Sequence, residues 1–137
     1  MPAERHSFKK EERLRSRKDI ETLFSRGEVA YSYPLRLIYL VKEPGDNPPA
    51  KMGVAVSRRN FKKATDRNLI KRRIREAYRQ NKEILVQPLR ERGVSAILMI
   101  QYTAKKILPY CDIEVAVKEL LQKTGRAPES RPELKIT

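Results

Sequence analysis

The sequence has almost none of the residues that build covalent or metal-based chemistry. It contains one cysteine, Cys111, and one histidine, His6, among 137 residues. A single cysteine excludes an internal disulfide framework and a CxxC metal knuckle, which is typical of proteins from a reducing cytoplasm. Because one histidine in a charged terminal segment offers no nucleophile and base pair and no metal cluster, we predict no catalytic residue and no metal held by this chain alone.

Long apolar runs are also absent. No stretch approaches the roughly 20 apolar residues of a membrane span, and the start, MPAERHSFKK, has no apolar signal core. We therefore expect a cytoplasmic protein with no membrane partner. A length of 137 residues with 39% hydrophobic residues suffices for one compact core. We expect one domain at 13–125, a flexible basic segment at 1–12 and a disordered tail at 126–137.

Acidic residues are few compared with basic ones. There are 17 Asp and Glu against 31 Lys and Arg, which gives a formal charge of +14. Two segments hold this whole excess: residues 58–82, with 11 basic and 2 acidic side chains, and residues 5–18, with 7 basic and 2 acidic ones. Neutralising several phosphates at once requires such clusters, so the charge pattern predicts a polyanionic partner.

Hydrophobic periodicity predicts an α+β domain. Two strand-like runs are separated by a stretch rich in Pro, Gly, Asp and Asn, and we interpret them as a hairpin with a long loop. The longest helix should end before Pro88, because helical backbone is disfavoured before proline. The expected order is helix, strand, strand, helix, strand, helix, over residues 16–27, 35–42, 51–57, 65–86, 93–103 and 108–125.

The predicted helix at 65–86 carries a basic surface beside its apolar face. Like charges four residues apart destabilise a helix by roughly 0.2–0.5 kcal/mol per pair, and few acids here relieve them, so binding explains the pattern better than solvation does. For Asn68 alone, capping of the first turn is an equally good explanation. One ridge consists of Arg67, Lys71 and Arg75, and the ridge next to it consists of Asn68, Arg72 and Arg79.

The segment GVAVSRRNFKKATDRNLIKRRIREAYR closely resembles the signature of the protein subunit of bacterial ribonuclease P. There a Gly-containing strand end with two basic residues leads into an Arg-Asn-Arg helix. RLRSRKDIETLFSRG is similar to the family's first helix and GVSAILMIQYTA to its last strand, so the resemblance extends from about Arg13 to Lys123. The chain departs from the motif at Leu69, where the family usually has arginine. Arg72 and Arg73 compensate for the charge but not for the position.

The resemblance implies a fold and a function. The fold would be a sheet of about four strands packed with three helices in α-β-β-β-α-β-α order. It would contain the left-handed β-α-β crossover of ribosomal S5 domain 2-like proteins, where periodicity alone favours a right-handed one. The function would be that of an RNA-binding cofactor that assists a catalytic RNA in removing the 5′ leader from precursor tRNA. The partners would be the catalytic RNA and precursor tRNA, with no DNA, and Mg²⁺ would be bound mainly by the RNA.

Two groups of contact residues follow from the resemblance. Residues of the basic helix and of the preceding loop would face the catalytic RNA: Arg58, Arg59, Lys62, Lys63, Arg67, Asn68, Lys71, Arg72, Arg75 and Arg79. A cleft between the first helix and one sheet face would hold the single-stranded leader, where stacking on aromatic rings contributes roughly 1–3 kcal/mol per base. Its candidate residues are Phe24, Ile20, Arg36, Ile38 and Ser57.

The sequence itself contains arguments for and against the residues assigned to the cleft. Ile20 stands where the family often has a second aromatic residue, which weakens stacking there, and Phe24 is equally well explained as a core residue. Arg36, Ile38 and Leu40 share one face of their strand by alternation. Because burying Arg36 is unfavourable, that face should include the wet cleft.

Other functions are compatible with parts of the pattern. A ribosomal RNA-binding or ribosome-assembly protein would show the same basic helix on a small α+β domain. A sequence-specific DNA-binding domain fits less well, because no helix-turn-helix spacing is present. An autonomous nuclease lacks catalytic groups, and Mg²⁺-dependent cleavage by the protein alone would identify one.

Overall fold

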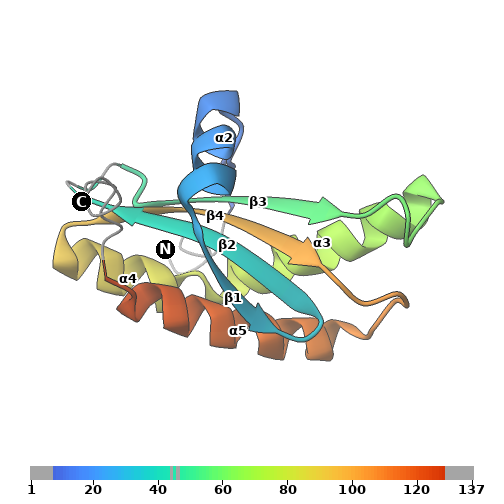
Figure 1. Ribbon diagram of the computed structural model, residues 1–137. Helices are drawn as coiled ribbons and strands as arrows, with labels where there is room; N and C mark the ends of the chain where they lie inside the picture. The colour runs from blue at the N-terminus through green and yellow to red at the C-terminus, as the bar shows by residue number, and fades with distance from the viewer. Residues whose placement is uncertain (1–7, 44, 46, 129–137) are drawn as a thin grey trace.

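The computed structural model describes residues 8–43, 45 and 47–128. A four-stranded sheet in the order β1-β2-β4-β3 has three helices on one face and one on the other (Figure 1), so the predicted α+β class is confirmed. The elements are η1 (Lys10–Glu12), α2 (Arg17–Arg26), β1 (Glu28–Ser32), β2 (Leu35–Lys42), β3 (Ala50–Val56), α3 (Ala64–Asn81), α4 (Glu83–Arg92), β4 (Ser95–Tyr102) and α5 (Tyr110–Arg126).

The predicted hairpin between the second and third strands is wrong. β2 and β3 are not neighbours, because β4 lies between them, antiparallel to β2 and parallel to β3. Seven of the eight side chains of β4 are buried, so this strand needs cover on both faces and takes a central place. β2 instead forms its hairpin with β1, a strand that periodicity did not predict and in which all five residues are half-buried or exposed.

The predicted long helix is divided in two. α3 ends at Asn81 and α4 begins at Glu83, and α4 continues through Pro88 to Arg92. The expected end before Pro88 is therefore wrong. Proline removes one hydrogen bond from this short helix, and α5 packs tightly over the same turn, since a Cβ added at Gly125 would lie 3.4 Å from the carbonyl oxygen of Ile84. α4 ends at Arg92, and Gly93 caps it with a left-handed φ of 68°.

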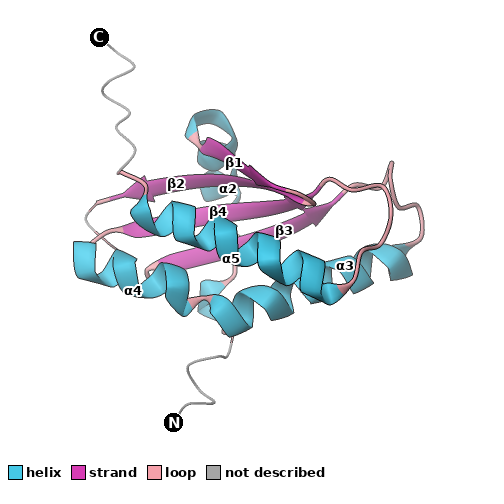
Figure 2. Ribbon diagram, turned by 90° about the horizontal axis from the view of Figure 1, so that it is seen from below, coloured by secondary structure: helices cyan, strands magenta, loops and turns pink. Residues whose placement is uncertain are grey.

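The crossover from β3 to β4 positions the basic helix. β3 and β4 run parallel, and the chain between them passes under the sheet through α3 and α4 (Figures 1 and 2). Followed from β3 to β4 in these views, the connection is left-handed, as the family resemblance implied and against the general right-handed rule. As a result α3 lies beneath β3 at the edge of the sheet, with one side open to solvent.

Two apolar clusters hold the layers together. The larger one lies between the sheet and α3, α4 and α5, and it contains the fully buried Ile70, Ile74 and Tyr78 of α3. The smaller one lies under α2 on the opposite face and includes Leu23, Ile38 and Leu40. Arg36, Ile38 and Leu40 therefore belong to the α2 side of the sheet, as alternation predicted.

α2 begins and ends as the sequence predicted. The Ser16 hydroxyl accepts a hydrogen bond from the backbone N–H of Asp19 at 3.2 Å and caps the first turn. At the other end the N–H of Gly27 donates to the carbonyl of Leu23 at 2.7 Å. A Cβ at Gly27 would lie 2.4 Å from that carbonyl oxygen and 2.7 Å from Cγ2 of Ile38, so only glycine fits where α2 meets β1.

The predicted domain limits, residues 13 and 125, can be compared with the ordered elements at the two ends of the described chain. Residues 8–12 fall in the segment predicted to be flexible, and they contain η1 and contact α3 through Phe8. At the other end α5 continues to Arg126. Residues 1–7 of the predicted flexible segment and residues 129–137 of the predicted tail lie outside the described residues.

Candidate nucleic-acid interface

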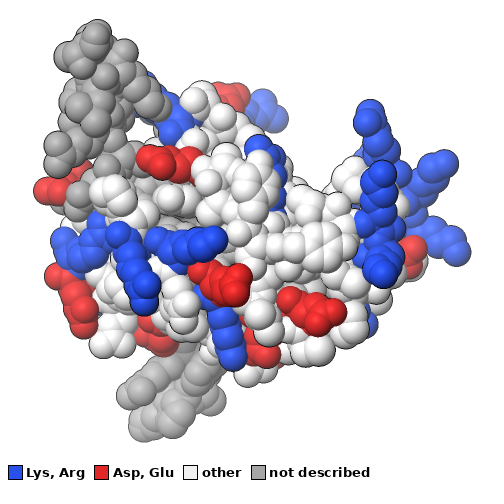
Figure 3. Space-filling view, turned by 60° about the horizontal axis from the view of Figure 1, so that its bottom comes forward, with Lys and Arg blue, Asp and Glu red and all other residues white. Residues whose placement is uncertain are grey.

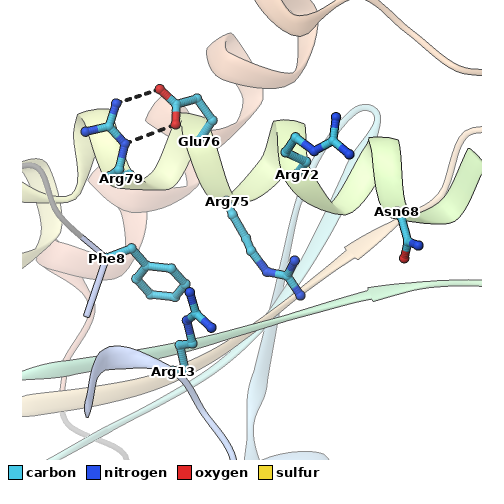
Figure 4. Close-up of a pocket in the computed structure, with 7 residues that line it drawn as sticks. All are labelled: Phe8, Arg13, Asn68, Arg72, Arg75, Glu76 and Arg79. Atoms are coloured by element: carbon cyan, nitrogen blue, oxygen red, sulfur yellow. Dashed lines mark hydrogen bonds and ion pairs between the residues drawn. The ribbon is translucent and has the colours of Figure 1, made fainter. Parts of the chain in front are cut away.

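Several basic residues of α3 line an open pocket of about 490 Å³. Its α3 residues are one turn or less apart along the exposed side of the helix, while two further residues reach it from the N-terminal segment (Figure 4). Four arginines therefore meet around one hollow that contains a single acid. The lining residues are Phe8, Arg13, Asn68, Arg72, Arg75, Glu76 and Arg79.

The N-terminal wall of the pocket is fixed by three kinds of contact. The backbone N–H of Leu14 donates to the carbonyl of Met52 in β3 at 3.1 Å. The guanidinium carbon of Arg13 lies 5.3 Å from the centre of the Phe8 ring, which in turn packs edge-on against Tyr78 of α3 with the ring centres 5.5 Å apart. These contacts hold the Arg13 charge opposite α3.

An ion pair ties the same segment to the end of α3. Lys82 Nζ lies 2.8 Å from a carboxylate oxygen of Glu12, and the two side chains are only 8% and 15% exposed. Ion pairs so well shielded from water are screened little by salt. The pair therefore helps to fix η1 against the junction of α3 and α4.

The electrostatics of the pocket favour an anion. Burial lowers the pKa of the Arg75 guanidinium, and the nearby charge of Arg13 lowers it further. Hydrogen bonds from Arg79 and Gln80 hold the pKa of Glu76 at about 2, so this carboxylate is ionised at neutral pH and neutralises part of the arginine charge. A bound phosphate would relieve the remaining repulsion between Arg13 and Arg75.

Two of the predicted α3 residues have roles that the sequence did not show. The guanidinium of Arg67 donates to the carbonyls of Phe61 and Lys62 at 2.8 and 2.9 Å, so it organises the loop before α3. Asn68 lines the pocket. The N-cap residue of α3 is Lys63, which makes no side-chain cap hydrogen bond, so the alternative that Asn68 caps the first turn is not supported. Lys71 lies between these residues and is half-buried.

No neighbouring arginine occupies the place of the one that Leu69 replaces in the family motif. Leu69 is half-buried, and the neighbouring arginines point in different directions. Arg72 lines the pocket, whereas Arg73 donates to the carbonyl of Leu108 at 2.7 Å in the loop before α5. Arg73 therefore supports the fold on the side away from the pocket.

The loop between β3 and α3 carries the other predicted cations. The hydroxyl of Ser57 accepts hydrogen bonds from the backbone N–H groups of Arg59 and Asn60 at 3.0 and 3.4 Å, which forms a tight turn at the end of β3. Figure 3 shows Lys and Arg side chains gathered at this end of the molecule. The exposed basic residues of the loop are Arg58, Arg59, Lys62 and Lys63.

The residues predicted for the leader cleft on α2 and β2 lie on the α2 side of the sheet and differ in their exposure. Phe24 is 51% exposed, so the alternative of core packing does not apply to it. Ile38 is only 4% exposed and packs under α2, and Ile20 packs beside it, so they form the floor of this region. Arg36 is half-buried and donates to Oε1 of Gln101 at 2.6 Å.

Sequence reasoning missed aromatic residues beside this cleft. Tyr31 of β1 stands opposite Arg36, which stands opposite Gln101 of β4, so the three form one row across the α2 face. Tyr31 and Tyr33 are 64% and 69% exposed. EVAYS contains a valine, an alanine and a tyrosine, which is a weak strand signal, but five residues are too few to identify a strand by periodicity.

The described part of the chain does not gather its Cys, Asp and Glu side chains into a metal site. Within residues 8–43, 45 and 47–128, no cluster of three or more His, Cys, Asp or Glu could hold a metal ion. Cys111 is exposed and His6 lies outside the described residues. In the same part of the chain no helix is long and apolar enough to span a membrane.

Comparison with known proteins identifies the family. The family model for ribonuclease P matches residues 8–125. The chain belongs to the ribonuclease P protein family. The ribonuclease P protein component of Porphyromonas gingivalis is 34% identical over 122 residues, which cover 88% of this chain and 89% of that protein. That of a Picosynechococcus species is 35% identical over 111 residues, covering 81% of this chain and 85% of the relative.

The solved structures agree on the fold of this ribonuclease P protein. The Thermotoga maritima RNase P protein superposes with a TM-score of 0.65 at 22% identity, covering 82% of this chain and 96% of that one. The Staphylococcus aureus RNase P protein gives a TM-score of 0.62 at 17% identity, with coverage of 81% and 93%. The family places the chain as the RNA-binding protein cofactor of a ribonucleoprotein endoribonuclease that acts in tRNA processing and whose catalysis lies in its RNA. The ribosome-assembly alternative is not favoured.

Proposed function

We propose that the arginine pocket docks the catalytic RNA of ribonuclease P and that the α2 side of the sheet holds the 5′ leader of precursor tRNA. The observation that carries the proposal is the meeting of Arg13, Arg72, Arg75 and Arg79 around one open hollow. Guanidinium groups donate in a planar fork that matches phosphate oxygens. A hollow with several such forks suits a folded RNA backbone, where phosphates approach from more than one direction.

The pocket is prepared for an anion before RNA arrives. Burial lowers the pKa of Arg75 and the nearby charge of Arg13 lowers it further, so an anion that enters between them would relieve their repulsion. Asn68 adds an amide that donates and accepts hydrogen bonds at the pocket wall. Lys71, Arg58, Arg59, Lys62 and Lys63 would extend the contact to neighbouring phosphates, and Arg67 would act through the loop that it organises.

The leader would follow the opposite face of the sheet. Phe24 offers a half-exposed ring on which an unpaired base can stack. The row formed by Tyr31, Arg36 and Gln101 offers a second ring, a positive charge and an amide beside it. Contacts of this kind tolerate many sequences, since every base has a face that can stack.

Mg²⁺ enters this proposal through the RNA. The described residues contain no group of acids suited to a divalent ion, so we propose that the ions are bound mainly by RNA phosphates. The arginine charges would reduce repulsion between phosphates of the catalytic RNA and the substrate, so fewer free ions are needed. We also propose that the protein works in the cytoplasm, where precursor tRNA is made.

The test is cleavage of a precursor tRNA by a bacterial ribonuclease P RNA transcript at low Mg²⁺, with and without the protein. We expect the protein to stimulate cleavage at the leader junction and to cleave nothing when the RNA is omitted. Tight binding to ribosomal RNA together with no stimulation would overturn the proposal in favour of ribosome assembly. Cleavage by the protein alone would overturn it in favour of an autonomous nuclease.

A further inference from the structure

A second loop carries positive charge at the same end of the molecule as the loop before α3. The connection between β4 and α5 contains Lys105 and Lys106, both exposed. In Figures 1 and 2 this connection and the β3–α3 loop lie together at one end of the sheet. The two lysines are 23 or more residues beyond the basic segment at 58–82, so charge clustering along the sequence gave no reason to join them to it.

The fold pins the second loop against the first. The ring of Tyr102 packs against that of Phe61, with the centres 5.8 Å apart. The Tyr102 hydroxyl donates to the carbonyl of Lys106 at 2.8 Å and accepts from the N–H of Leu108 at 3.0 Å. The carbonyl of Leu108 also accepts the hydrogen bond from Arg73, so α3 holds this loop directly.

The first strand pair holds the start of the same loop. The backbone N–H and the hydroxyl of Thr103 both donate to the carbonyl of Pro34, at 2.8 and 3.0 Å. The backbone on both sides of Lys105 and Lys106 is thus fixed by hydrogen bonds. Cations on a fixed backbone lose less conformational entropy when they bind than cations on a free loop.

The charge at this end is not neutralised by ion pairs. Among the described residues none of the exposed cations of the two loops forms one, although the pocket of α3 contains the pair of Glu76 and Arg79. Figure 3 shows the basic side chains projecting from this end into solvent. The cations that we group as the loop-end patch are Arg58, Arg59, Lys62, Lys63, Lys105 and Lys106.

We propose that the loop-end patch is a second phosphate-binding surface for the catalytic RNA, in which Lys105 and Lys106 continue the α3 contact around the end of the sheet. The inference rests on the proposed function, since it takes the occupant of α3 to be that RNA. Continuity decides the occupant: Lys62 and Lys63 lead directly into α3, and Arg67 connects the loop to the helix. A lysine ammonium group is a point charge without a planar fork, so the contact is with RNA phosphates and is independent of sequence.

The experiment measures binding of the full chain to a bacterial ribonuclease P RNA transcript over a range of salt concentrations. The variant K105Q/K106Q is compared with K118Q/R90Q, which removes the same charge from exposed positions on α5 and α4. Each lost phosphate contact makes the negative slope of log K against log salt shallower by about 0.7–0.9. For K105Q/K106Q, and not for the control, we expect a slope smaller in magnitude by about 1.4–1.8, which corresponds to an affinity lower by about 14- to 30-fold at 0.15 M salt relative to 1 M. K105R/K106R should retain the slope of the wild type.

The outcomes separate this inference from the proposed function. If K105Q/K106Q matches the control while the wild type binds the RNA, the loop-end patch is overturned and the proposed function stands. If only the affinity of the assembled enzyme for precursor tRNA falls, the patch contacts the substrate, and the assignment to the catalytic RNA is overturned. If the wild type itself does not bind the transcript, the proposed function fails first.

Discussion

Replacing Glu12 by glutamine should loosen the N-terminal wall of the arginine pocket. The Glu12–Lys82 pair is 2.8 Å long, and its side chains are 15% and 8% exposed. Breaking a fully buried pair from one side costs about 3–5 kcal/mol. Here glutamine keeps the shape and one acceptor, and Glu12 is partly wet, so we expect a loss of about 2 kcal/mol in the free energy of unfolding. For a chain of this length that lowers Tm by about 6–10 °C.

Urea unfolding and RNA binding should be measured on the same variant. Glu11→Gln is the matched control, because Glu11 is the exposed neighbour and its loss changes the net charge equally. If charge alone mattered, both variants would bind RNA more tightly than the wild type. We expect Glu12→Gln to bind more weakly than Glu11→Gln under conditions in which both are folded, since Arg13 loses its support. Equal stability and equal affinity of the two variants would refute the reasoning.

Three further predictions concern other parts of the molecule. Glu76→Gln should lower stability by less than about 1 kcal/mol at pH 7, because its pair with Arg79 is more than a third exposed, and should tighten RNA binding. With a pKa of about 2 against an ordinary 4.5, the Glu76 contribution is present above pH 4.5 and is lost as pH falls toward 2. Urea unfolding at pH 7 and 2.5 should therefore bring the two proteins closer at low pH, and a gap that widens would contradict this. Phe24→Ala should weaken binding of precursor tRNA by roughly 1–3 kcal/mol and leave that of leaderless tRNA unchanged. An equal loss for both RNAs would count against the cleft. Gly27→Ala should lower the free energy of unfolding by more than about 2 kcal/mol, because its Cβ would collide with the Leu23 carbonyl. Thermal unfolding at the wild-type Tm would show that α2 shifts at little energetic expense.

Local pattern was enough to place most elements but not to pair them. The limits of α2 followed from a serine cap and a glycine, and β2 and β4 followed from apolar runs. Pairing depends on which strand needs cover on both faces. In this chain that strand is β4, the last one along the sequence. The prediction therefore wrongly paired β2 with β3, which are neighbours in sequence but not in the sheet. The continuation of α4 through Pro88 depends on packing by α5, which no local rule contains.

The site was predictable in charge more than in geometry. Helical spacing identified the arginines of α3, but Arg67 binds backbone carbonyls and Ile38 is buried under α2. Phe8 and Arg13 were not found, because they lie in a charged segment without periodicity and reach the pocket only through contacts with distant residues. Side chains that line a site from non-adjacent segments become visible only when the fold is known.

The central place of β4 also determines when the protein becomes competent during its synthesis. β2 and β3 are translated early, yet the strand that joins them spans residues 95–102. Until that strand leaves the ribosome, the basic residues of α3 are displayed on a chain whose sheet is still open along two strands. Such long-range pairing is slow compared with helix formation, so α3 can meet nascent RNA before its own support is built. The partners of the N-terminal segment in β3 and α3 are made earlier, but the sheet that supports α3 is complete only once residues 95–102 have joined β2 to β3.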